Sequence, residues 1–141
     1  MTRLLSVLLF AFALAACASN GPTEAGRSAS GTIEVSMSDE LRFEPAEFTI
    51  APGETVRFEV TNDGGTVHEF LIGDEAAQAE FEAEMAGEEM DHDSDAGVSV
   101  EPGQTETFDY DFGAEAGELL AGCHEPGHYD AGMVATITIS E

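Results

Sequence analysis

The segment that decides the fold reads Cys123-His124-Glu125-Pro126-Gly127-His128-Tyr129-Asp130-Ala131-Gly132-Met133. It delivers a thiol, an imidazole and a thioether, with four residues between each successive pair. A strand pattern over residues 117–123 precedes it, and a run rich in β-branched residues follows it over 134–140. Three potential metal ligands on a loop held by two strands indicate a rigid metal site. A fourth ligand has to come from elsewhere, and His68 in a predicted strand over 66–72 is the candidate.

The choice of side chains points to copper. Cu(I) prefers thiolate and thioether sulfur, Cu(II) prefers imidazole, and a trigonal His₂Cys set with a long axial Met suits both. We therefore expect one copper ion at His68, Cys123, His128 and Met133. Zinc also accepts thiolate and imidazole ligands, but it would favour a harder fourth ligand or water. Taken singly, each side chain could be an ordinary core residue; the combination favours a metal site.

These residues carry a resemblance to the cupredoxin, or type 1 blue copper, family over residues 31–141. In that family one upstream His precedes a Cys…His…Met loop, and the loop spacing here is similar to rusticyanin and auracyanin. The run over 43–56 resembles the opening strands of small bacterial cupredoxins, including copper-tolerance proteins. Two positions depart from the family. Glu69 stands where many members have an Asn that ties the ligand loops together. His124 directly follows the ligand Cys, and we expect His124 to have a surface or ligand-supporting role.

Period-two alternation of apolar and polar residues dominates the rest of the domain. Pro-Gly turns at 52–53 and 102–103 separate such runs. This pattern predicts seven or eight half-buried strands in an all-β, antiparallel, Greek-key sandwich, the fold that the resemblance also implies. The alternating apolar residues are Ile33, Val35, Met37, Phe48, Ile50, Val56, Phe58, Val60, Phe108, Tyr110 and Phe112.

One segment, residues 74–90, interrupts the strands. It is rich in Ala, Glu and Met, and Ala77, Phe81 and Met85 recur every four residues, which predicts a short helical insert with one apolar stripe. Met85, Met90 and His92 could form an accessory Cu(I) site there. The competing interpretation is that Met85 faces the core and that residues 88–95 form a solvated acidic loop.

The first 16 residues have the pattern of an export signal. A basic start is followed by an apolar run of about 13 residues, too short for a transmembrane helix. The run ends in Leu14-Ala15-Ala16-Cys17, which resembles a bacterial lipobox. We expect cleavage before a lipidated Cys17, a flexible tether over 17–30 and a domain over 31–141 at the periplasmic or outer face of the cell membrane. An ordinary secretory signal with an incidental cysteine is the alternative.

The chain is strongly acidic, with a formal net charge of −25 from 29 acidic and four basic residues. Such a polyanion repels nucleic acid and anionic membrane surfaces, so we expect membrane contact only through the N-terminal lipid. A basic redox partner or a salty habitat that screens the charge would each explain the excess. We expect a monomer.

Two functions fit these residues. The first is one-electron transfer between redox partners of the cell envelope, and the second is periplasmic copper handling by buffering, delivery or resistance. The sequence has no Ser/His/Asp arrangement, no Gly-rich phosphate loop and too few histidines for a second, catalytic copper. We therefore expect a carrier or binding protein rather than an enzyme.

Overall fold

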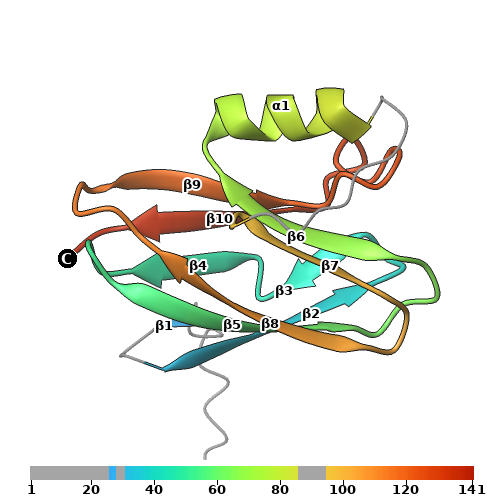
Figure 1. Cartoon of the computed structure of the whole chain (residues 1–141), viewed down its shortest axis with the longest axis horizontal. Helices are drawn as coiled ribbons and strands as arrows, with labels where there is room; N and C mark the ends of the chain where they lie inside the picture. The colour runs from blue at the N-terminus through green and yellow to red at the C-terminus, as the bar shows by residue number, and fades with distance from the viewer. Residues whose placement is uncertain (1–25, 28–30, 86–94) are drawn as a thin grey trace, which may run out of the picture.

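A computed structural model describes residues 26–27, 31–85 and 95–141. These residues form two packed sheets, one of six strands in the order β1-β4-β10-β9-β6-β7 and one of four in the order β3-β2-β5-β8. Within these described ranges one helix, α1, lies outside the six-stranded sheet (Figure 1). The elements are β1 Gly26–Arg27, β2 Thr32–Ser38, β3 Arg42–Glu44, β4 Glu47–Ile50, β5 Thr55–Asn62, β6 His68–Gly73, α1 Glu75–Met85, β7 Gly97–Val100, β8 Thr105–Asp111, β9 Gly117–Gly122 and β10 Val134–Ile139.

The alternation in the sequence corresponds to the inner and outer faces of the sheets. In β5, Val56, Phe58 and Val60 are buried, whereas Arg57 and Glu59 between them are exposed. Aromatic rings fill the space between the sheets, with ring centroids 5.2–6.4 Å apart. The predicted β-sandwich is therefore confirmed. The packed rings are those of Phe43, Phe48, Phe58, Phe70, Phe108 and Phe112.

The strand directions differ from the expected antiparallel arrangement, because both sheets are mixed. β2 pairs in parallel with β5, and β4 pairs in parallel with both β10 and β1. The reason is the path of the chain, which leaves the β2–β3 hairpin, crosses to the other sheet as β4 and returns as β5. β2 and β5 consequently run in the same direction. β1 lies within the range expected to be a tether, and the rest of residues 17–30 lies outside the described residues.

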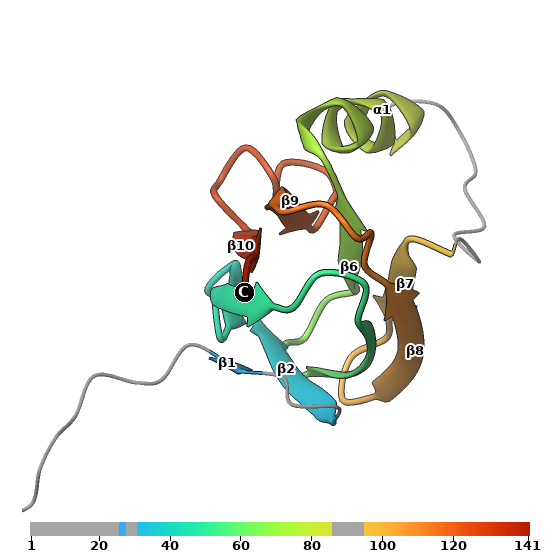
Figure 2. The ribbon, with the colours of Figure 1, turned by 90° about the vertical axis from the view of Figure 1, so that its left-hand side faces the viewer.

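Helix α1 packs on the outer face of the six-stranded sheet, over β6 and β9 (Figures 1 and 2). Two glycines permit the close approach. A Cβ on Gly73 would lie 2.6 Å from the Cβ of Ala77, and one on Gly122 would collide with Gln78 Oε1. Asp74 caps the helix by accepting the backbone N–H of Ala77 at 2.9 Å. β6, which the helix covers in part, is buried along its whole length.

The predicted helical insert is present, and the expected stripe of Ala77, Phe81 and Met85 lies on its sheet-facing side, with Ala77 and Phe81 next to Gly73 of β6. These three residues are half-buried, and the fully buried residue of α1 is the polar Gln78. The carbonyls of Leu71 and Leu120 in the strands beneath the helix accept hydrogen bonds from Gln78, which explains a polar side chain at this position. No helix in the described part of the chain is long and apolar enough to cross a membrane.

Candidate metal centre

The predicted ligands come from two neighbouring strands and the loop between β9 and β10. His68 is the first residue of β6, and Cys123 directly follows β9. β6 and β9 pair antiparallel, with Leu71 opposite Gly122, so the start of β6 lies beside the end of β9. His128 lies in the middle of the loop over 123–133, and Met133 ends it immediately before β10.

The structure brings three of these side chains together, with all ligand atoms within 4.8 Å of one another. The two Nδ1 atoms of His68 and His128 are 3.3 Å apart. Cys123 Sγ lies 3.3 Å from His128 Nδ1 and 3.9 Å from His68 Nδ1. In this triangle the point equidistant from the three atoms lies about 2 Å from each, close to a metal–nitrogen bond length. The donor set and its size therefore fit one metal ion.

The loop that carries the other ligands is closed by its own backbone. Cys123 N–H donates to the Met133 carbonyl at 3.2 Å, and Met133 N–H donates to the His128 carbonyl at 3.0 Å. Gly127 and Gly132 adopt φ of 83° and 94°, conformations that favour glycine. Met133 is completely buried at the closing end of the loop. The backbone thus holds the three loop residues at fixed positions relative to one another.

Burial sets the protonation of the site. Cys123 is fully buried, and burial raises the pKa of its thiol to about 11. Burial, followed by the nearby His128, lowers the pKa of His68, so its imidazole is neutral at neutral pH and can bind a metal without losing a proton. His128 is half-buried and is the more accessible of the two imidazoles.

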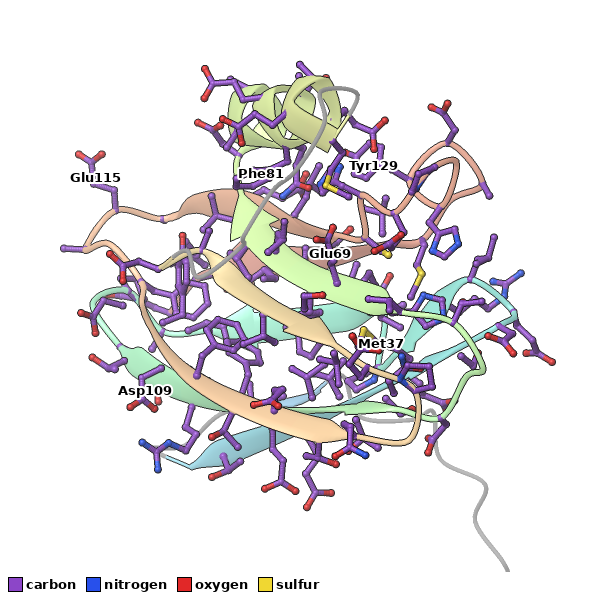
Figure 3. The ribbon with its side chains drawn as sticks, turned by 45° about the vertical axis from the view of Figure 1, so that its right-hand side comes forward. Met37, Glu69, Phe81, Asp109, Glu115 and Tyr129 are labelled. Carbon is purple, nitrogen blue, oxygen red and sulfur yellow. The ribbon has the colours of Figure 1, made fainter. Side chains whose placement is uncertain are left out.

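Glu69 links the segment of His68 to that of Cys123 by hydrogen bonds, the role that the family resemblance assigns to an Asn. Its backbone N–H donates to Cys123 Sγ at 3.3 Å. Its carboxylate oxygen Oε2 accepts the backbone N–H of His124 at 3.2 Å. A residue directly after one ligand is thereby bonded to a second ligand and to that ligand's neighbour. Glu69 is buried, and Figure 3 shows it on the α1 side of the molecule, whereas Asp109 lies on the opposite side.

His124 is buried beneath α1 and does not lie on the surface. Its Nε2 lies 2.7 Å from Gln78 Oε1, and its Nδ1 lies 2.9 Å from Glu82 Oε1. Its ring stacks on Tyr129, with centroids 4.8 Å apart. Sequence reasoning missed this cluster, although Gln78 and Glu82 are four residues apart and so share one face of a helix. Figure 3 shows Phe81 and Tyr129 on this same side.

The remaining site predictions fall mostly outside the described residues. Met85 is half-buried at the end of α1, while Met90 and His92 lie in the range 86–94, outside the part that the structure describes. The predicted lipidation residue, Cys17, also lies outside the described residues. The accessory metal site and the lipid anchor therefore stay predictions.

Comparisons with known proteins agree with this geometry. The model of the copper binding proteins of the plastocyanin/azurin family matches residues 29–140. The copper-resistant cuproprotein CopI of Rubrivivax gelatinosus is 38% identical over 77% of this chain and 66% of its own length. CopI of Pseudomonas aeruginosa is 34% identical over 84% of this chain and 80% of its own length. The crystal structure of dithionite-reduced auracyanin from Roseiflexus castenholzii, 27% identical, superposes with a TM-score of 0.68 over 81% of this chain and all of that chain.

Proposed function

This chain belongs to the plastocyanin/azurin family of copper-binding proteins, and on that premise we propose that it transfers single electrons in the cell envelope. The proposal places one type 1 copper at His68, Cys123, His128 and Met133. The observation that supports it best is the preassembled triangle of ligand atoms, two of them on fully buried residues.

A preassembled site suits electron transfer because the ligands need not move when the charge of the metal changes. When bound, copper supplies a one-electron couple between Cu(I) and Cu(II). The protein contributes one thiolate from Cys123 and the imidazoles of His68 and His128, and both Cys123 and His68 are fully buried. The Glu69 N–H bond to Sγ fixes the direction of the sulfur. Because His128 is the half-exposed ligand, the edge around residues 126–132 is the side on which a partner would approach.

Copper resistance is the second candidate function, and the CopI relatives favour it. Two proteins whose name is copper-resistant cuproprotein match most of this chain at 34–38% identity. The same centre would then serve to bind or deliver copper, and Met85, Met90 and His92 would add a second site. Both functions fit export of the chain and attachment through a lipidated Cys17, with a basic protein as partner. Neither requires an enzymatic step.

One substitution separates the two functions. Met133→Leu removes the weak axial ligand but leaves the three strong ligands, so we expect copper to stay bound while its reduction potential changes. If electron transfer is the function, Met133→Leu changes the rate of electron exchange with the redox partner. Introducing this variant into a deletion strain then leaves the copper tolerance of that strain unchanged. If resistance is the function, Met133→Leu complements the copper sensitivity of the deletion strain, and Cys123→Ser does not. A deletion strain with normal copper tolerance would exclude the second function.

A further inference from the structure

His68 presents its two ring nitrogens to different surroundings. Nδ1 faces the other ligands, 3.3 Å from His128 Nδ1. Nε2 is completely buried and has no hydrogen-bond partner among the described residues, and Oδ1 of Asp39 lies 3.7 Å away. When Nδ1 binds a metal, the neutral ring carries its proton on Nε2. A buried N–H then needs an acceptor, and Asp39 is about half an ångström beyond normal hydrogen-bond distance.

Asp39 is held in place by the segment that leads into His68. Both carboxylate oxygens accept the backbone N–H of Gly65, at 2.9 and 3.0 Å. The hydroxyl of Thr66 donates a longer hydrogen bond to Oδ1 at 3.5 Å. These donors, led by the Gly65 N–H, lower the pKa of Asp39, so the carboxylate is ionised at neutral pH. Asp39 therefore presents a fixed negative charge beside the buried ring.

Gly64 lies close to both side chains of this pair. A Cβ on Gly64 would lie 2.5 Å from Asp39 Oδ1 and 3.0 Å from His68 Nε2. Gly64 itself is anchored through its N–H, which donates to the Asn62 side chain at 2.9 Å. The amide of Asn62 donates in turn to the carbonyls of Thr66 and Val100, at 2.7 and 2.8 Å. The only residue type without a side chain thus stands where the carboxylate and the imidazole face each other.

We propose that Asp39 is a positioning residue for the ligand His68, accepting the Nε2 hydrogen bond when Nδ1 binds copper. A carboxylate on the far nitrogen fixes the tautomer and the ring orientation of a metal-bound histidine and makes the ring a stronger donor. The negative charge favours Cu(II) over Cu(I) and lowers the reduction potential. This inference rests on the proposed copper site.

The first test compares the reduction potentials of the copper-loaded wild type, Asp39→Asn and Glu40→Gln. Asp39→Asn keeps an acceptor for Gly65 but removes the charge, and Glu40→Gln removes an exposed neighbouring charge. We expect Asp39→Asn to lower the preference for Cu(II) about tenfold, a rise of about 59 mV for one electron. Glu40→Gln should raise the potential far less. Equal shifts in the two variants, or none in Asp39→Asn, would overturn the proposal.

A second test uses the wild type alone, so its result does not depend on whether a variant folds. In the diamagnetic Cu(I) form of the wild type, nitrogen-labelled NMR should detect the His68 Nε2–H as a slowly exchanging signal shifted by a hydrogen bond. A deprotonated Nε2, or a proton that exchanges as in free imidazole, would contradict the role of Asp39. His68→Gly distinguishes a failure of the proposed copper site from a failure of the proposed Asp39 role. If that variant keeps the wild-type copper spectrum, the copper site itself is wrong; if it loses the spectrum while Asp39→Asn has no effect, only the Asp39 role fails.

Discussion

The Nε2 of His124 lies 2.7 Å from Oε1 of Gln78, so the residue after the thiol ligand is bonded directly to helix α1. Gln78 uses all of its hydrogen-bonding groups, because its Nε2 also donates to the carbonyls of Leu71 in β6 and Leu120 in β9, both at 3.1 Å. One buried amide thus joins the helix to both strands that lead to the metal centre.

Gln78→Ala should destabilise the fold without removing a metal ligand. The substitution leaves the buried carbonyl of Leu71, the part-buried carbonyl of Leu120 and the buried imidazole of His124 without this partner, and we expect a loss of about 2–4 kcal/mol in the free energy of unfolding. Chemical denaturation of the metal-free protein measures it. Glu80→Ala, at an exposed position of the same helix, is the control and should change stability by less than about 0.5 kcal/mol. Equal stability of the two variants would show that the Gln78 contacts contribute nothing.

The metal-free protein should lose stability above about pH 9. Burial raises the pKa of the Cys123 thiol from 9.0 to about 11 in the folded state, so the folded protein holds this proton more tightly than the unfolded chain. The contribution is complete below the unfolded pKa and disappears as the pH rises to the folded value. Its size is about 2–3 kcal/mol at most.

The pH effect is isolated by comparing the wild type with Cys123→Ala. Burial also raises the pKa values of Tyr110 and Tyr129, so their ionisation at high pH likewise lowers the free energy of unfolding. Both tyrosines are present in both proteins, and their effect cancels in the comparison. The difference in unfolding free energy between the two proteins should therefore be constant below pH 9 and shrink between pH 9 and 11. A constant difference through this range would mean that Cys123 is not buried as a thiol.

Salt should stabilise this protein. With 29 acidic and four basic residues, the folded chain repels itself, and the exposed Arg57–Asp109 pair at 2.7 Å offsets little of that repulsion. Raising NaCl from about 20 mM to 0.5 M shortens the screening length several-fold, and the melting temperature of the metal-free protein should rise by several degrees. An uncharged osmolyte at equal osmolality is the control. A melting temperature independent of salt would contradict the repulsion argument.

The sequence predicted the elements whose pattern is local. Alternation identified the buried residues of β2 and β5, and the spacing of Cys123 and His128 identified two side chains that the structure brings beside His68. Strand direction was not predictable in this way, because the parallel pairing of β2 with β5 depends on a crossover between sheets.

Polar contacts between residues that are far apart in the sequence could not be predicted either. No local pattern distinguishes Gln78 from the other polar residues of its acidic helix, and its burial follows only from the positions of Leu71, Leu120 and His124. Asp39 is a turn residue with no local pattern, and only the fold places it beside His68. Such contacts join residues whose sequence separations carry no periodic signal.

The most direct test of the central claim is the visible spectrum of the metal-free protein during titration with Cu(II), beside Cys123→Ser. An intense thiolate-to-copper band should grow to one equivalent in the wild type and be absent in the variant, because the band requires the Cys123 sulfur as a ligand. A wild-type protein that shows only the weak bands of copper bound to nitrogen and oxygen, or a variant that keeps the intense band, would contradict the copper centre described above.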